Sequence, residues 1–203
     1  MAATRTYRAR RTPSRSDATR ERITAAVREL LAEGSFHEST VEEVAARAGV
    51  SRATVYQHFH SRLDLVDAIC DTFAANPALI ALRSTVELPD PQRALEQTIA
   101  LSVRFWASED GVLRELYGVV GIDPAARALV ERQRADRRSE LQRLARHLKR
   151  NGRLRGGTRE REALDALMVL TSYETFCELR LAGRSERQIV ALLGRGARAL
   201  LLG

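Results

Sequence analysis

The stretch TVEEVAARAGVSRATVYQHF, residues 40–59, holds two short segments with helical spacing on either side of the tetrapeptide AGVS. In the first segment, Thr40 is placed to cap a helix that ends at Gly49, and in the second Ser51 caps a helix that runs to about Phe59. Isolated helices shorter than roughly 12 residues are marginal in water, so neither segment is stable alone. The pattern therefore predicts a helix-turn-helix, in which the first helix braces the second.

Longer segments with apolar periodicity flank this pair. The first predicted helix runs from about residue 17 to 33 with an apolar stripe on one face, and Gly34 supplies a stop. After the pair, Ser61 is placed to cap a helix that ends around the dipeptide NP, residues 76–77. The segments before Ser61 can share one core, which short helices need. We therefore expect an N-terminal three-helix module over residues 17–75, including the start of a linking helix.

The rest of the chain also shows helical spacing and no strand-like alternation. Further helices are predicted at residues 77–83, 89–108, 111–120, 123–151, 158–181 and 185–202. The last two form a helical hairpin around AGRS, and the break near residues 76–90 separates the N-terminal module from a larger body over residues 76–203. The predicted fold class is all-α.

The formal charge of +7 on this chain of 203 residues is unevenly distributed. Residues 1–16 contain five arginines and no acid, whereas residues 17–62 contain six arginines and seven acids. A basic arm punctuated by Ser, Thr and Pro, ahead of a near-neutral module, predicts a disordered tail. Such a tail either is solvated or contacts a polyanion.

Composition also bounds the compartment and the kinds of site. No run of about 18 apolar residues exists, and the N-terminus lacks the apolar segment of a secretion signal, so we expect a cytoplasmic protein. Cys70 and Cys177 lie far apart without partner spacing, which indicates buried thiols in preference to a disulfide or zinc site. No cofactor is expected.

The polar side chains of the second short helix are of types that suit DNA. A short helix fits the major groove of about 12 Å, where arginine can donate two hydrogen bonds to guanine, and Arg52 is the candidate for that contact. Hydroxyl and imidazole donors can bind phosphate oxygens, and a helix N-terminus adds backbone N–H groups. The candidates for phosphate contacts are Ser51, Thr54, Tyr56, His58, the backbone N–H of Thr40, and Arg62.

The run ITAAVRELLAEGSFHESTVEEVAARAGVSRATVYQHFHSRLDLVDAI, Ile23 to Ile69, closely resembles the DNA-binding module of TetR-family transcriptional regulators. The matching features are the Gly-Phe-type turn after the first helix, Thr40 before VEEVAARAGVS, and then TVYQHFHSRLDL. Two positions depart from the family pattern, because Gln57 stands where tyrosine is usual and Arg62 stands where lysine is common. Arg62 keeps the charge, whereas Gln57 could alter DNA contacts or simply be exposed.

The resemblance implies a homodimer, a roughly palindromic operator of double-stranded DNA, and a variable C-terminal ligand-binding and dimerisation domain. It also implies that the last two helices, residues 158–181 and 185–202, form a four-helix bundle with those of a second copy. Pairing two reading helices across half-sites about one DNA turn apart would supply the specificity that one short helix lacks. The protein is thus expected to be a repressor that an unknown small-molecule effector releases.

The expected effector pocket lies among the C-terminal helices, where apolar area combines with polar groups. Its candidate lining residues are Phe105, Trp106, Tyr117, Met168, Tyr173, Phe176 and Cys177. Each of them could instead be packed in the core. Possible polar anchors are Asp165, Glu174 and Arg104. The arginine-rich segment between Arg132 and Arg146 reads as a solvated face, with an acidic ligand as the alternative.

Two other classes of function remain open at this stage. His58 and His60 have the wrong spacing on a helix for a metal site, and we expect no metal. No nucleophile elbow or Gly-rich phosphate loop occurs, so we expect no catalytic residues; an all-α enzyme without a recognised motif is the alternative. A ligand-independent DNA-binding protein is a further alternative, which would show no change in DNA affinity with ligand.

Overall fold

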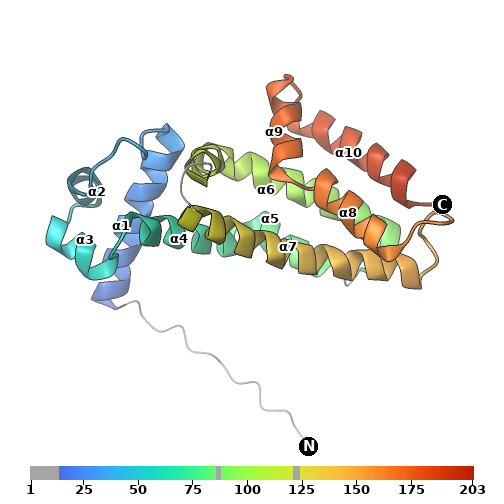
Figure 1. The fold of residues 1–203 in the computed structure, drawn as a ribbon, viewed down its shortest axis with the longest axis horizontal. Coiled ribbons are helices and arrows are strands. Elements are labelled where there is room, and N and C mark those ends of the chain that lie inside the picture. Colours follow the sequence, from blue (N-terminus) through green and yellow to red (C-terminus); the bar gives the residue numbers. More distant parts are fainter. Residues whose placement is uncertain (1–13, 86–87, 121–123) are drawn as a thin grey trace, which may run out of the picture.

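The computed structural model describes residues 14–85, 88–120 and 124–203. Across these residues the regular elements are α-helices and one 3₁₀ turn, which confirms the all-α prediction (Figure 1). Most of the basic arm predicted over residues 1–16 lies outside the described residues. The N-terminal helix-turn-helix module and the larger helical body lie side by side along the long axis of the molecule (Figure 1).

The N-terminal module comprises α1 (Arg15–Glu33), α2 (Val41–Ala48) and α3 (Arg52–His58). Both predicted glycine stops are confirmed, since Gly34 and Gly49 end α1 and α2 with φ of 74° and 63°. These left-handed conformations are the ones that glycine adopts without a steric penalty. The turn from α2 to α3 therefore has the sharpness that the sequence predicted.

The helix α1 begins two residues before the predicted start at residue 17. Ser14 caps it: its hydroxyl accepts a hydrogen bond from the Asp17 backbone N–H, and the Asp17 carboxylate accepts one from the Ser14 N–H. This capping box satisfies two amide groups of the first turn, so Asp17 lies inside the helix. The last part of the predicted arm, Arg15 and Ser16, is helical.

A bent linker joins the module to the body. It consists of α4 (Arg62–Thr72), the 3₁₀ turn η1 (Phe73–Ala75) and α5 (Pro77–Thr85). Ser61 caps α4 as predicted, and its hydroxyl accepts a hydrogen bond from the Asp64 backbone N–H. The predicted boundary at residues 76–77 is therefore a bend between elements that both pack against the body.

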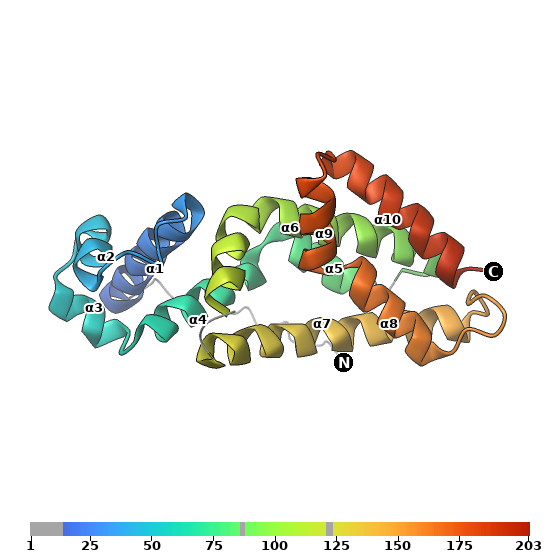
Figure 2. The same cartoon turned by 45° about the horizontal axis from the view of Figure 1, so that its top comes forward.

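The body contains α6 (Pro91–Val120), α7 (Pro124–Arg150), α8 (Glu160–Leu170), α9 (Tyr173–Leu181) and α10 (Glu186–Leu201). Two long helices, α6 and α7, run along the long axis, with α10 packed on α6 and α8 packed on α7 (Figure 2). One apolar cluster extends from Ile23 in α1 to Leu201 in α10. In the described part of the chain no single helix has the length and apolar composition of a membrane span; only α4 with η1 and α5, taken together across their bend, passes that test.

The separate helices predicted at residues 89–108 and 111–120 are wrong, because α6 is continuous through Gly111. At this point α6 crosses α1, and a Cβ added to Gly111 would lie 3.5 Å from the Ala32 carbonyl oxygen. Glycine here permits close packing of two helices instead of ending one. Packing outweighs the intrinsic helix cost of a glycine, which is about 1 kcal/mol.

The single helix predicted over residues 158–181 is also wrong, because the chain breaks between α8 and α9. Ser172 caps α9 by accepting a hydrogen bond from the Thr175 backbone N–H at 3.1 Å. The Thr171 hydroxyl donates to the Leu167 carbonyl and closes the end of α8. The predicted turn around AGRS is confirmed, with Gly183 at φ 79° and Ser185 as the N-cap of α10.

Candidate nucleic-acid interface and ligand cavity

The exposed face of α3 carries Arg52, Ala53, Tyr56 and Gln57, and Val55 is buried on the opposite face. Ala53 is exposed and does not contribute to the core. At 3.6 residues per turn, Ala53 lies between Tyr56 and Gln57 around the helix axis, on the exposed side. The face therefore combines one cation, one phenol and one amide around a small residue.

Arg52 stands in the first turn of α3, where its guanidinium is available to a partner. Arg52 Nη1 lies 2.5 Å from Oε1 of Glu42 in α2, and both side chains are more than half exposed. The guanidinium also lies over the Tyr56 ring, 5.4 Å from its centroid. An exposed pair of this kind is worth about 0–1 kcal/mol, so a stronger acceptor can replace Glu42 at small cost.

The hydroxyl residues predicted to meet phosphate stand at helix starts. Thr40 caps α2, with its hydroxyl accepting a hydrogen bond from the Glu43 backbone N–H at 3.2 Å. Ser51 caps α3 in the same way through the Thr54 backbone N–H at 3.1 Å, and its hydroxyl also lies 2.8 Å from that of Thr54. His58 is half-buried at the last turn of α3. The structure thus places these residues at the starts of α2 and α3 and at the last turn of α3, and their contact with phosphate stays a prediction.

Arg62 is held against the protein. Its Nη1 donates to the Ser39 carbonyl at 2.8 Å, and the guanidinium stacks 3.9 Å from the centroid of the buried Phe36 ring. Burial lowers the pKa of Arg62. This arginine ties the start of α4 to the segment before α2, and a phosphate contact would add to that structural role.

Two arginines that the sequence reading did not single out brace the helix-turn-helix from α1. Arg22 donates from Nη2 to the carbonyls of Ala48 and Gly49, both at 2.6 Å, and so clamps the turn after α2. Arg20 lies 4.3 Å from the centroid of the Phe59 ring. A cation near carbonyls at a helix C-terminus is favourable. In the sequence, Arg20 and Arg22 look like ordinary solvated arginines on the exposed face of α1, so nothing in the pattern indicated these contacts.

A cavity of about 460 Å³ lies in the body, between the linker helices and α6 to α9. Its apolar wall includes Phe73, Leu82, Phe105, Trp106, Leu116 and Met168. Its polar lining includes Ser102, Tyr117, Gln133, Arg134, Arg137 and Glu174. A largely apolar cavity of this size with a few convergent polar groups is typical of a small-molecule site.

Comparisons with known proteins find similarity to bacterial transcriptional regulators. A sequence model described as "Bacterial regulatory proteins, tetR family" matches residues 23–69. The HTH-type transcriptional repressor BepR of Brucella suis is 31% identical over 102 residues, which are 50% of this chain and 49% of BepR. Residues 23–69 therefore resemble the DNA-binding module of TetR-family regulators. The aligned region spans about half the length of this curated relative.

Solved structures share the fold over almost the whole chain. NalD of Pseudomonas aeruginosa, the secondary repressor of the MexAB-OprM multidrug efflux pump, has a TM-score of 0.69 at 23% identity, covering 93% of this chain and 98% of NalD. SmeT, solved as a complex with triclosan, has a TM-score of 0.70 at 18% identity and covers 92% of each chain. These likenesses extend the TetR fold to the helical body.

Four of the seven predicted pocket residues line the cavity, namely Phe105, Trp106, Tyr117 and Met168. Tyr173, Phe176 and Cys177 are not among its lining residues, so their prediction is corrected. The break before Ser172 reorients α9, and Tyr173 donates to Oδ1 of Asp110 at 2.9 Å and packs on Phe176. The prediction treated residues 158–181 as one helix, and on one helix these three residues could not be told apart from those that face the cavity.

Of the suggested polar anchors, the structure places only Glu174 at the cavity. Asp165 lies 3.6 Å from Arg138 in an ion pair, and Arg104 is exposed. From the arginine-rich segment, Arg134 and Arg137 line the cavity. The alternative of an acidic ligand therefore gains a specific pair of residues.

Arg137 and Trp106 share one acceptor at the end of α8. Arg137 Nη1 donates to the Thr171 carbonyl at 2.8 Å, and Trp106 Nε1 donates to the same oxygen at 2.9 Å. Burial lowers the pKa of Arg137 and raises that of Tyr117 to about 12, so Tyr117 is a neutral hydroxyl at physiological pH. The cavity wall therefore contains a cation, Arg137, held by a backbone carbonyl, and a neutral hydroxyl, that of Tyr117.

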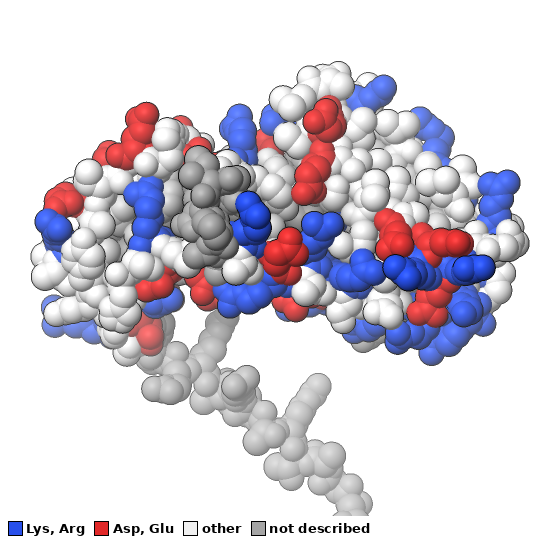
Figure 3. Space-filling model, in the orientation of Figure 1, with Lys and Arg blue, Asp and Glu red and all other residues white. Residues whose placement is uncertain are grey.

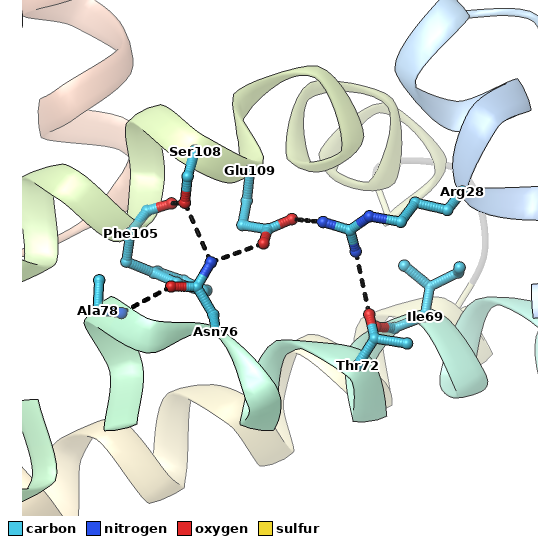
Figure 4. A network of polar contacts seen from close by, with 8 residues as sticks. All are labelled: Arg28, Ile69, Thr72, Asn76, Ala78, Phe105, Ser108 and Glu109. Carbon is cyan, nitrogen blue, oxygen red and sulfur yellow. Dashed lines mark hydrogen bonds and ion pairs between the residues drawn. The ribbon is translucent and has the colours of Figure 1, made fainter. Parts of the chain in front are cut away.

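A polar network connects the module to the body (Figure 4). Glu109 of α6 is 5% exposed and forms an ion pair with Arg28 of α1. Arg28 Nη1 donates to the Thr72 hydroxyl at 3.0 Å, and Asn76 Nδ2 donates to Oε1 of Glu109 at 2.7 Å (Figure 4). One buried carboxylate thus joins α1, the linker bend and α6.

The network adjoins the cavity wall. Phe73, in the linker, lies 6.0 Å below the Arg28 guanidinium and packs edge-on against Phe105 with ring centroids 5.7 Å apart. Both rings line the cavity. A change in the cavity at these rings would therefore reach the contact between α1 and α6.

The charged residues on the face shown in Figure 3 do not form a further binding site as well defined as the cavity. Figure 3 shows lysine and arginine gathered over the end of α7, while the N-terminal module presents both signs. Within residues 14–85, 88–120 and 124–203, no group of three or more His, Cys, Asp or Glu side chains is arranged to hold a metal ion. Cys70 is buried, and burial raises the pKa of its thiol to about 11.

Proposed function

We propose that the chain is a DNA-binding transcriptional repressor that acts as a homodimer on a roughly palindromic operator and is released by a small-molecule effector. The observation that carries this proposal is the exposed α3 face with Arg52 near the helix N-terminus, braced by α1 and α2. In this proposal Arg52 reads a base edge in the major groove, and Thr40, Ser51, Thr54, Tyr56, His58 and Arg62 contact the phosphates. A protein with this role acts where the DNA is, in the cytoplasm.

Dimerisation is supported by exposed apolar side chains at the other end of the chain. Val169 of α8, Leu181 of α9 and Leu200 of α10 are each more than half exposed. In the proposal these side chains form one apolar patch, which would mark a protein interface. The partner in the proposal is a second copy joined through the last helices, α8 to α10, so that two α3 helices face half-sites about one DNA turn or a multiple of it apart.

Release by the effector requires that the cavity and the DNA-binding face be coupled. Binding of a ligand against Phe73 and Phe105 would favour one arrangement of the network formed by Arg28, Glu109 and Asn76. That arrangement sets the position of α1 relative to α6 and therefore the separation of the two α3 helices. The ligand shifts the population of dimer geometries by as much as its affinities for them differ.

Selection of operators from random duplexes tests the proposed function. We expect the full chain to enrich a sequence with two related half-sites and to bind it as a dimer, measured by light scattering of the complex. Enrichment of a single unpaired half-site would refute the homodimeric operator. Failure to enrich any sequence, with the protein folded by circular dichroism, would refute specific DNA binding.

A further inference from the structure

The cavity is lined by three arginines and three carboxylates, and Arg137 differs from the other two arginines in its surroundings. Arg83 pairs with Glu140 across 3.8 Å. Asp136, Arg134 and Glu174 are exposed, so water screens their charges. Arg137 is half-buried and has no carboxylate within ion-pair distance among the residues that the structure describes. Its nearest acceptors are backbone carbonyls, and Glu174 acts on its charge from beyond ion-pair distance.

The guanidinium of Arg137 is fixed from one side. Nη1 donates to the Thr171 carbonyl at 2.8 Å and to the Met168 carbonyl at 3.4 Å. Nε and Nη2 form no hydrogen bond with the described residues. A planar guanidinium held by one nitrogen presents its other N–H groups in the fork that matches a carboxylate.

Further hydroxyls line the same cavity. Ser102 of α6 is 5% exposed, lines the cavity, and makes no side-chain hydrogen bond within the described chain. Tyr117 contributes a phenol. A hydroxyl that lines the cavity can donate a hydrogen bond to a ligand oxygen. Arg137, Ser102 and Tyr117 can therefore each donate to an anion.

The remainder of the lining is suited to an apolar body. Leu79, Leu82, Phe105, Trp106, Leu116 and Met168 form a continuous wall of aliphatic, aromatic and thioether groups. Burial of apolar surface contributes roughly 25 cal/mol per Å², so most of the affinity would come from this wall. The donors would then fix the orientation of the ligand and exclude wrong charges.

We propose that the effector is an amphipathic carboxylic acid, whose carboxylate pairs with Nε and Nη2 of Arg137 and whose apolar body lies against Phe105 and Trp106. This inference deepens the proposed function, since it names the ligand class of the cavity. Arg134, Asp136 and Glu174 are exposed, so water screens their charges, and the half-buried Arg137 selects the sign of the ligand. A neutral ligand would leave this cation unpaired, and a cationic ligand would meet it directly.

Trp106 makes the test independent of DNA. It is the only tryptophan in the sequence and lines the cavity, so its fluorescence reports occupancy. Decanoate, 1-decanol and decyltrimethylammonium are titrated into the full chain at neutral pH, each below its aggregation limit. We expect decanoate to bind at least about tenfold more tightly than the other two, because charge-assisted hydrogen bonds supply the difference. Equal or tighter binding of the alcohol or the cation, or no response to decanoate, overturns the inference.

The variant Arg137→Gln locates the carboxylate. We expect it to weaken decanoate about tenfold and to change 1-decanol binding less than about twofold. Arg138→Gln is the matched control, because Arg138 is the next residue on α7, is exposed, and is not a lining residue. Equal losses for both probes would show that Arg137 only supports the wall. If Arg137→Gln does not fold, the comparison of the three probes on the unaltered chain still decides the ligand class.

This result and the operator selection can fail separately. Decanoate binding without operator enrichment would refute the DNA-binding proposal and keep the ligand class. Operator enrichment with no preference for decanoate would keep the regulator and refute the amphipathic acid.

Discussion

Arg28 and Arg137 are both partly buried arginines in contact with the same cavity wall, and they differ in what their guanidinium groups face. Arg28 meets the buried carboxylate of Glu109, while Arg137 meets backbone carbonyls. A paired charge makes its position a fixed part of the fold. A charge without a carboxylate in ion-pair distance retains attraction for an anion. The first arginine therefore joins two parts of the chain, and the second is available to a ligand.

The two sites also differ in what truncation would leave behind. Removal of the Arg28 side chain leaves Glu109, 5% exposed, with Asn76 as a donor but without a cation. Removal of the Arg137 side chain leaves the Thr171 carbonyl, which still accepts from Trp106. Buried charges without a partner are far more costly than buried dipoles. Substitution of each arginine tests this difference.

The largest effect is expected for Arg28→Ala. Breaking a buried pair by removing one partner costs about 3–5 kcal/mol, and because Arg28 is partly exposed and Asn76 still donates, we expect about 3 kcal/mol of lost unfolding free energy. Urea denaturation followed by circular dichroism measures it. Arg114→Ala, at an exposed position on the same helix as Glu109, is the control and should change stability by less than about 0.5 kcal/mol. A loss below about 1 kcal/mol for Arg28→Ala, the value of a surface ion pair, would contradict the joining role.

Arg52→Ala is expected to have the next largest effect, on DNA affinity instead of stability. Arg52 differs from both buried arginines because its partner Glu42 is exposed and exchangeable. Loss of a bidentate base contact should weaken binding to the selected operator by about 1–3 kcal/mol and relax the preference at one base pair. Fluorescence anisotropy with selected and random duplexes measures both. Equal losses on the two duplexes would rule out base reading by Arg52.

The N-terminal module could be predicted closely from the sequence because its signals are local. Thr40, Ser51 and Ser61 cap helices through bonds to residues three positions ahead, and Gly34 and Gly49 adopt the left-handed conformation that ends a helix. Each of these features depends on neighbours within one helical turn. Local sequence is sufficient for such features.

The body was predicted less well because its decisive contacts are distant in sequence. Gly111 reads as a stop, yet its packing against Ala32 lies 79 residues away in the chain. The same holds for Glu109, whose partners Arg28 and Asn76 come from other helices. Which side of α9 faces the cavity depends on the helix break at Ser172. The apolar pattern runs on through this position, so the sequence does not reveal the break. Spacing alone does not specify which faces of separate helices meet.

A smaller effect is expected for Asn76→Ala, which tests whether the network transmits the state of the cavity. The variant loses hydrogen bonds to Glu109, to Ser108 and from the Ala78 N–H, and should cost about 1 kcal/mol of stability. We expect decanoate to bind as before, by Trp106 fluorescence, and to change operator affinity less than it does in the unaltered chain. An undiminished effect of decanoate on operator affinity would place the coupling elsewhere.

The smallest effect on stability is expected for Arg137→Gln, and it decides whether the comparison holds. The variant loses the donation from Nη1 to the Thr171 carbonyl, which still accepts from Trp106 at 2.9 Å. Burial disfavours the charged form of Arg137, as its lowered pKa indicates, so removal of the charge offsets part of that loss. We expect a change in unfolding free energy of less than about 1 kcal/mol, measured by urea denaturation beside Arg28→Ala. A cost equal to that of Arg28→Ala would mean that the fold depends on both arginines alike, and that Arg137 owes its place in the cavity wall to packing and not to an anion.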